Sequence, residues 1–286
     1  MLREKLRRAI EGEALLAAAA GGHGAARVTP MHHHAKGQLL GCDRGLVTIG
    51  TAAGSWCVPA AHAVWLPPHL PHAVRSHGDY RGWSLYVAEA ACAALPSGLR
   101  IIRVSPLLQA AALRAAEWEQ APPEGARAHL AAVILDEIAQ APAAPFGLPM
   151  PQDARLLRIA QALAADPAAR QRMEDWAAWA GIAPRSLSRR FVQETGFSFT
   201  EWVQRLRLLR ALERLAEGAS VTSVALDLGY SNVSFFITLF RRSFGRTPHA
   251  YHAAPPEAEA AGDEPDGGMC TASQSVSRSG SVQATR

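Results

Sequence analysis

The chain has 286 residues and a mass of 30.5 kDa, which is enough for two ordinary domains and too much for a lone small motif. Hydrophobic residues make up 49% of the chain and charged residues 19%, a balance that excludes a fibrous or wholly disordered protein. The formal net charge is +4, and only Lys5 and Lys36 among the 29 basic residues are lysines. Arginine therefore carries nearly all the positive charge, and its planar fork suits phosphate and guanine.

Residues 1–26 combine a basic start with an alanine-rich stretch, which superficially resembles a secretion signal. Glu11 and Glu13 interrupt that pattern, and no convincing cleavage site follows, so we interpret the segment as an alanine-rich N-terminal extension. No apolar run reaches the ~18 residues that a membrane-spanning helix needs. The cysteines lie far apart without a CxxC pair, which predicts reduced thiols in a cytoplasmic protein: Cys42, Cys57, Cys92 and Cys270.

Residues 27–140 are predicted to form the first domain. Short β segments separated by turn residues fill residues 27–104, and this regular spacing predicts a small barrel or sandwich. From Pro106 onward apolar residues recur at helical spacing, which predicts two helices that close the domain. The predicted strands are Gln38–Cys42, Leu46–Ile49, Ser55–Val58, Ala63–Leu66, Ala73–Ser76, Trp83–Val87 and Ile101–Val104.

Two histidine-containing segments lie in this domain, at residues 32–38 and 67–72. On a strand, His32 and His34 point to one face and His33 to the other. The segments resemble the two signature segments of a cupin barrel, with Gln38 where metal-binding cupins often have glutamate. The resemblance implies a divalent ion such as nickel, cobalt, zinc or iron(II), held by His32, His34, Gln38 and His72.

Two other interpretations of the first domain stay open. The histidines also suit an effector pocket without an ion, or side chains satisfied by local hydrogen bonds. The aromatic residues fit either the wall of a pocket for a planar effector or the barrel core: Trp56, Trp65, Trp83 and Tyr86.

Two further segments are defined by composition. Residues 141–151 contain four prolines, which a continuous helix or central strand does not accept, so we predict an interdomain linker. Residues 152–254 carry 14 basic and 9 acidic residues and are predicted to be helical almost throughout. Residues 255–286 are rich in Pro, Glu, Gly and Ser and are predicted to form a disordered tail.

A helix-turn-helix pattern occurs twice in residues 152–254. In the first, a short apolar helix meets a turn at Gly181, and Pro184 opens the next helix at its favoured first position. The pattern returns 48 residues later with a turn at Gly229. The apolar anchors repeat as well, since Leu187 and Phe191 correspond to Phe236 and Phe240. A tandem match at equivalent spacing is far more specific than one glycine turn.

One helix is predicted to join the two units. Gly196 is typical of a helix end, and Ser198 with Glu201 forms a capping box, so a new helix begins at Ser198 and runs to about Leu215. Its length of roughly 27 Å places two recognition helices about 34 Å apart, which is one turn of B-DNA. We expect its arginines to face phosphates: Arg205, Arg207, Arg210 and Arg214.

The outward faces of the second helices are predicted to enter the major groove. Arg185, Ser188 and Arg189 share the face opposite the anchors. The equivalent set in the second unit has neither arginine nor glutamine, so we expect weak sequence reading there: Val233, Ser234, Ile237 and Thr238. The predicted DNA-binding residues are Arg185, Ser186, Ser188, Arg189, Arg190, Val233, Ser234, Thr238, Arg241 and Arg242.

Residues 173–252 closely resemble the DNA-binding domain of AraC/XylS-type transcriptional regulators. The residues that carry the resemblance include Trp176, Ala180-Gly181, Leu187, Arg189, Phe191, Gly196, Ala225, Gly229-Tyr230, Phe235, Phe240-Arg241 and the run Gly245 to Tyr251. It implies an α+β multidomain fold, with an N-terminal cupin-like β-barrel, following helices and a C-terminal all-α tandem helix-turn-helix domain.

The same resemblance implies a sequence-specific DNA-binding regulator whose cupin-like domain responds to a small-molecule or metal effector. It brings in promoter DNA, RNA polymerase and a second copy of the chain as partners. Two alternatives come from other classes: a dioxygenase-like cupin enzyme with iron(II) on His32, His34 and His72, and a nonspecific architectural DNA binder. We predict no catalytic residues, because no further acid, base or cofactor motif is present and an enzyme leaves the tandem repeat unexplained.

Overall fold

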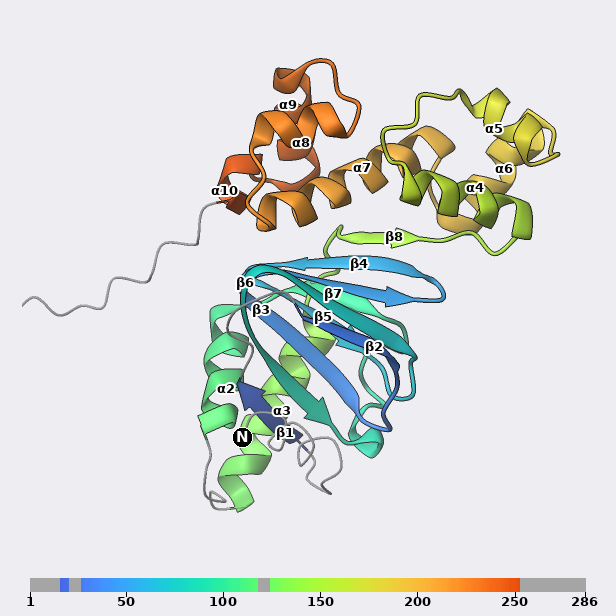
Figure 1. Cartoon of the computed structure of the whole chain (residues 1–286). Helices are drawn as coiled ribbons and strands as arrows, with labels where there is room; N and C mark the ends of the chain where they lie inside the picture. Colours follow the sequence, from blue (N-terminus) through green and yellow to red (C-terminus); the bar gives the residue numbers. More distant parts are fainter. Residues whose placement is uncertain (1–15, 21–26, 118–123, 253–286) are drawn as a thin grey trace, which may run out of the picture. The chain divides into compact units, whose positions relative to one another are not determined.

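The computed structural model describes residues 16–20, 27–117 and 124–252 (Figure 1). The predicted tail at 255–286, most of the N-terminal extension and Cys270 lie outside these residues. The strands pair antiparallel in one sheet. They are β1 (Leu16–Ala20), β2 (Val28–His32), β3 (Gly37–Thr51), β4 (Gly54–Pro59), β5 (His62–Leu66), β6 (His72–Val87), β7 (Arg100–Arg103) and β8 (Gly147–Pro149).

Two long strands, β3 and β6, organise the sheet. They pair along their length from Gly37 to Gly50, with irregular register between Cys42 and Leu46. Gly45 allows this irregularity, because its φ of +79° is a conformation that residues with a side chain rarely adopt. Four strands predicted as separate therefore merge into β3 and β6.

The sheet also uses residues expected outside the first domain. Strand β1, from the expected extension, pairs with Trp83–Val87 of β6. Strand β8, from the expected linker, pairs with β4 and with no other strand of the described chain. Such an edge position accommodates Pro149, which lacks an N–H for a second neighbour.

Along the central strands β3 and β6, residues of both faces are buried. Helices α2 (Pro106–Glu117) and α3 (Glu124–Gln140) lie beside the sheet, as the sequence predicts (Figure 1). Leu39, Leu85 and Ile134 share a core cluster with the tryptophans Trp65 and Trp83. Strand alternation turns Gln38 and its register partner Tyr86 to the opposite face, where the histidines lie.

The C-terminal half is helical. Its helices are α4 (Ala154–Ala165), α5 (Met173–Trp179), α6 (Pro184–Thr195), α7 (Phe199–Ala216), α8 (Val221–Asp227), α9 (Val233–Phe244) and α10 (Pro248–His252). The capping box of Ser198 and Glu201 and the left-handed Gly196 are present as predicted. No helix among the described residues is long and apolar enough to cross a membrane. Cys42, Cys57 and Cys92 are free thiols.

Candidate functional site

The structure contains the two predicted helix-turn-helix units, α5–α6 and α8–α9, joined by α7 (Figure 1). Positive φ angles of 64° at Gly181 and 83° at Gly229 let the chain turn between the helices of each pair. The anchors are all fully buried: Leu187, Phe191, Phe236 and Phe240. Because the anchors fix one face of α6 and α9 inward, the opposite faces point outward.

The outer face of α6 carries exposed arginine. Arg185 and Arg189 are exposed, and Ser188 beside them is partly exposed. Arg190 differs, since its guanidinium pairs with the carboxylate of Asp153, which also caps the start of α4. Its charge is already matched inside the protein, so it connects α6 to α4.

The outer face of α9 is nearly neutral until its last turn. Ser234 and Thr238 are exposed, and the Thr238 hydroxyl donates to the Ser234 carbonyl at 3.0 Å. Arg241 and Arg242 follow as exposed cations. Phe235 is 56% exposed beside Ser234, a surface position that the sequence analysis did not identify. The sequence contains a signal for this exposure, because adjacent residues of a helix point in different directions and the neighbouring Phe236 is a buried anchor.

The sequence predicts that the arginines of α7 face phosphates, but in the structure each of them has a partner within the protein. Arg205 donates to the Gly147 carbonyl, and Arg207 donates to the carbonyls of Pro167 and Ala169 at 2.7 and 2.9 Å. Arg210 pairs with Glu213 at 2.7 Å, and Arg214 with Asp227 at 2.8 Å. Arg210 also donates to the Ala164 carbonyl of α4 at 3.4 Å, so each of these guanidinium groups connects α7 to a neighbouring segment.

Further polar contacts connect the sheet to α7. The Thr48 hydroxyl of β3 donates to Glu213 Oε1 at 2.8 Å. His77 Nδ1 of β6 lies 2.8 Å from Glu217 Oε1. Trp202 Nε1 donates to the Pro149 carbonyl at 2.7 Å. A rearrangement of β3 or β6 therefore acts directly on the helix that joins the two helix-turn-helix units.

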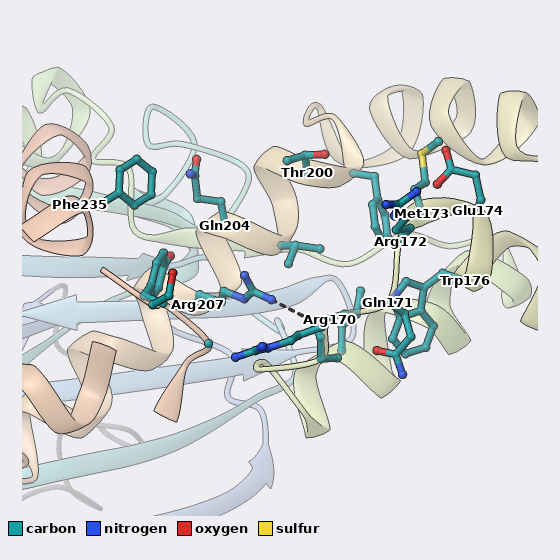
Figure 2. Close-up of a pocket in the computed structure, with 17 residues that line it drawn as sticks. Arg170, Gln171, Arg172, Met173, Glu174, Trp176, Thr200, Gln204, Arg207 and Phe235 are labelled. Atoms are coloured by element: carbon teal, nitrogen blue, oxygen red, sulfur yellow. Dashed lines mark hydrogen bonds between the residues drawn. The ribbon is translucent and has the colours of Figure 1, made fainter. Parts of the chain in front are cut away.

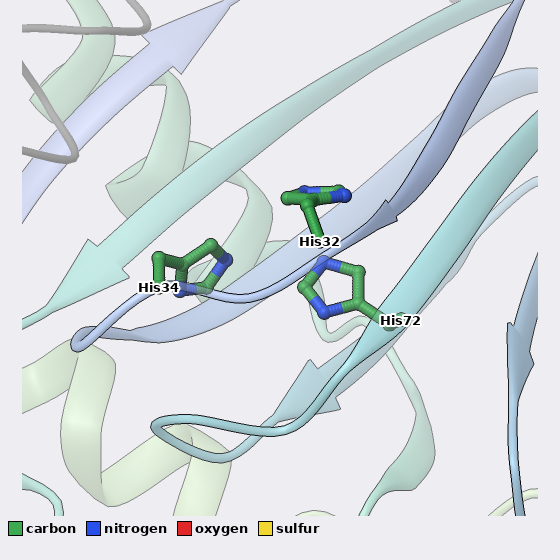
Figure 3. Close-up of side chains that lie close together, drawn as sticks. All are labelled: His32, His34 and His72. Carbon is green, nitrogen blue, oxygen red and sulfur yellow. The ribbon is translucent and has the colours of Figure 1, made fainter.

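Three histidines gather at one place in the sheet domain (Figure 3). His32 ends β2, His72 begins β6 opposite it, and His34 follows in the loop before β3. The ring centroids of His32 and His72 are 4.4 Å apart, and those of His34 and His72 are 5.2 Å apart. One nitrogen from each ring lies within 4.8 Å of the other two. His33 is exposed, as predicted, but it lies in the loop after β2 and not on a strand.

Backbone carbonyls orient all three rings. The Nδ1 atoms of His32, His34 and His72 lie 2.8, 2.6 and 2.8 Å from the carbonyl oxygens of Pro30, Lys36 and Leu70. Because a carbonyl only accepts, each Nδ1 carries a hydrogen, which leaves the Nε2 of a neutral ring with its lone pair. His72 Nε2 is buried and has no hydrogen-bond partner among the described residues.

Gln38 completes this group. Its Nε2 donates to Ser84 Oγ at 3.2 Å and to Tyr86 Oη at 3.0 Å, and its Oε1 lies 3.2 Å from His34 Nε2. Burial lowers the pKa of His72 to about 4, so its imidazole is neutral near pH 7. The three imidazole rings and an amide oxygen therefore lie together.

The four aromatic residues considered for an effector pocket do not gather in the same way. Trp65 and Trp83 are buried in the cluster beneath α2 and α3, where their Nε1 atoms donate to Pro96 O and Asp43 Oδ1. Tyr86 alone adjoins the histidines, with its ring centroid 5.5 Å from that of His34. Trp56 lies elsewhere, close against Gly147 of β8.

Two family profiles cover nearly the whole described chain. One, described as an AraC-like ligand binding domain, matches residues 17–171, and the other, described as a helix-turn-helix domain, matches residues 176–254. The transcriptional regulator NimR of Escherichia coli is 32% identical over 228 residues, which cover 79% of this chain and 82% of NimR. The chain belongs to the AraC family of transcriptional regulators.

Other relatives match smaller parts of this AraC-family chain. The regulator RipA of Corynebacterium glutamicum is 36% identical over 104 residues, which cover 36% of this chain and 31% of RipA. A solved structure of ToxT from Vibrio cholerae aligns with 83% of this chain and 97% of its own, at 10% identity and a TM-score of 0.36.

The family and the fold class predicted from the sequence are thus confirmed. This AraC-family chain is a transcriptional regulator with an N-terminal ligand-binding domain and a C-terminal helix-turn-helix DNA-binding domain. The named relatives are transcriptional regulators.

Proposed function

We propose that this regulator reads promoter DNA in the cytoplasm mainly through α6, in response to an effector bound in the sheet domain. The carrying observation is the outer face of α6, where Arg185 and Arg189 are exposed while the anchors opposite them are buried. Each arginine presents a fork that matches the O6 and N7 atoms of guanine in the major groove. RNA polymerase and a second copy of the chain are the further partners that we propose by family analogy.

The second unit holds the DNA more than it reads it. Val233, Ser234 and Thr238 offer at most a hydroxyl or an apolar contact to a thymine methyl group. Arg241 and Arg242 at the end of α9 are exposed cations suited to phosphates, which fix position without reading sequence.

Replacement of one arginine tests the assignment. Arg189→Ala is expected to weaken binding to the cognate promoter roughly 5- to 150-fold, as the loss of a bidentate contact worth ~1–3 kcal/mol requires, and to relax base preference at one or two positions. Arg103→Ala removes the same charge from an exposed site on β7 and is the matched control. Gel-shift titration of matched promoter variants makes the measurement. Unchanged discrimination in Arg189→Ala contradicts the assignment.

For the effector we propose a divalent ion of the zinc, nickel, cobalt and iron(II) class, bound by His32, His34 and His72 with the Gln38 amide oxygen beside them. The residues fit such an ion because each Nδ1 donates to a carbonyl, as in metal-bound histidines, which leaves the Nε2 of the neutral ring for the ion. The unpartnered Nε2 of His72 gives the same indication. Imidazole and amide donors suit borderline ions.

Metal analysis of the purified full chain tests this effector. We expect one equivalent of ion per chain, lost in His72→Ala and retained in His33→Ala, whose side chain is exposed on the other face. Gln38→Glu supplies a carboxylate ligand and is expected to bind the ion more tightly. If His72→Ala binds as much ion as the parent chain, the proposal fails and the organic-effector alternative takes its place.

The ion regulates DNA binding only if it prefers one arrangement of the protein. The contacts of Thr48 and His77 with Glu213 and Glu217 provide the physical link between the sheet and α7. DNA titrations with and without the ion measure this coupling, and equal affinity in both removes the regulatory role while leaving metal binding intact.

A further inference from the structure

A cleft of about 790 Å³ lies between the two helix-turn-helix units (Figure 2). It is lined by the start of α5 and the residues before it, by one stripe of α7, and by the turn before α9 with the first turn of that helix. Arg207 is the one lining residue that the sequence predicts to face phosphates. The residues that matter are Arg170, Arg172, Thr200, Gln204, Ser231 and Phe235.

The charge of the cleft is positive. Three arginines line it against a single acidic residue, Glu174. Arg170 and Arg172 are exposed. Arg207 lies deeper and holds the Pro167 and Ala169 carbonyls, so it fixes the loop that carries Arg170 (Figure 2). An anion in the cleft therefore meets the exposed guanidinium groups of Arg170 and Arg172.

The cleft also offers neutral hydrogen-bonding groups. Thr200, Gln204 and Ser231 lie along its length from the first unit to the second. Trp176 and Tyr230 also line the cleft, and their Nε1 and Oη atoms are buried without a hydrogen-bond partner in the described chain. A ligand rich in acceptor oxygen atoms matches such a set of donors.

The position of the cleft indicates which anion it receives. When two recognition helices occupy successive major grooves, the sugar-phosphate strands that border the intervening minor groove pass beneath the helix that joins them. The first helix of a helix-turn-helix crosses the DNA backbone, and here the start of that helix, α5, forms one end of the cleft. Phe235, next to the outward Ser234, forms the other end.

We propose that this cleft binds the phosphodiester backbone of the DNA between the two contacted major grooves, with Arg170 and Arg172 as phosphate ligands and Thr200 and Gln204 as neutral donors. The inference rests on the proposed DNA-reading function and adds a contact that carries no sequence information. Its role is to hold the duplex across the gap between the two units, so that both recognition helices stay in register.

Salt-dependent DNA titrations of the full chain test the proposal. Each phosphate contact releases bound counterions, so the slope of log K against log salt is expected to fall by about 0.9 for each of Arg170→Ala and Arg172→Ala. Affinity should decrease by the same factor for the cognate duplex and for a scrambled duplex. Arg103→Ala is the charge-matched control, and Arg189→Ala should lower cognate affinity more than scrambled affinity.

A second variant guards against an effect on folding. Gln204→Glu places a negative charge in the cleft and is expected to weaken both duplexes equally, with unchanged thermal unfolding of the free protein. Unchanged salt slopes in Arg170→Ala and Arg172→Ala overturn the inference, and so does a loss confined to the cognate duplex. If the parent chain shows no preference between duplexes, the proposed reading function fails, whereas the slopes still decide on the cleft.

Discussion

The two helix-turn-helix units share a frame, meaning their turn glycines and buried anchors, and differ in the residues on their outward faces. Both end in a left-handed glycine, Gly196 or Gly245, and both bury two anchors completely. The turn in the second unit is one residue longer, since its helix begins four residues after Gly229 and the first begins three residues after Gly181. At equivalent positions on the outward faces, α6 carries the exposed arginines Arg185 and Arg189, whereas α9 carries Ser234 and Thr238. The frame therefore constrains how a unit folds and leaves its reading of DNA free to vary.

The surroundings of the units differ as well. The first unit is held by contacts with the residues that precede α4. The Glu194 carboxylate accepts the backbone N–H groups of Gln152 and Asp153 at 2.8 and 2.9 Å. In the second unit, Phe244 stacks on Phe146 with ring centroids 5.1 Å apart and an angle of 10°. The second unit thus packs on residues that adjoin the sheet, which makes it the unit better placed to respond to the first domain.

The largest predicted effect tests whether the two frames are equivalent. Phe191→Ala and Phe240→Ala each empty a fully buried site, so each should lower the free energy of unfolding by ~3–5 kcal/mol. Urea unfolding of the full chain measures both. The controls Val192→Ala and Phe235→Ala remove exposed apolar side chains and should change stability by less than ~0.5 kcal/mol. If only one of the two anchor variants loses stability by this amount, the two frames are not equivalent.

The next prediction transfers the reading surface. Ser234 and Thr238 stand one and five residues after the start of α9, the positions that Arg185 and Arg189 occupy in α6. Thr238→Arg should therefore add ~1–3 kcal/mol of preference for guanine at one base pair in the second half-site.

Competition between duplexes that differ at that base pair measures the change. Gln140→Arg adds the same charge at an exposed position on α3 and should strengthen binding without base preference. If Thr238→Arg only behaves like Gln140→Arg, the outer face of α9 does not reach the bases and the equivalence ends at the frame.

Local signals account for what the sequence predicted well. The start of α7 follows from Ser198 and Glu201, which satisfy each other's backbone N–H groups within one turn. His32 and His34 lie together and His33 apart, as the sequence predicts, although β2 ends at His32 and the loop after it, not strand alternation, places the other two. Such patterns need only neighbouring residues, so a single sequence contains them.

The features that the sequence did not predict depend on contacts between residues far apart in the chain. Arg205 and Arg207 were expected at phosphates, yet their partners are backbone carbonyls 58 and 40 residues away. Strand β8 forms in a proline-rich segment because β4 offers an edge to pair with. The hydrogen bonds that direct the three histidine Nε2 atoms depend on the local backbone path, which composition does not specify.

The smallest predicted effect concerns the contact between the sheet and the second unit. The His62 ring lies edge-on to Phe146 with centroids 4.7 Å apart, and Phe146 stacks on Phe244. Burial lowers the pKa of His62 below its ordinary 6.5, assisted by the charges of Arg103 and Arg246 and opposed by the hydrogen bond to Ala60 O. The folded protein therefore takes up this proton less readily than the unfolded chain does.

The sign of the pH dependence follows. Stability from the neutral His62 is complete above pH 6.5 and is lost as the pH falls through that value towards the lower pKa of the folded state. The drop in melting temperature between pH 7.5 and 5.5 should be smaller in His62→Gln than in the parent chain, while the exposed-site control His129→Gln should match the parent. An equal drop in His62→Gln shows that other groups cause the loss of stability in acid. The contact between His62 and Phe146 is then not pH-sensitive.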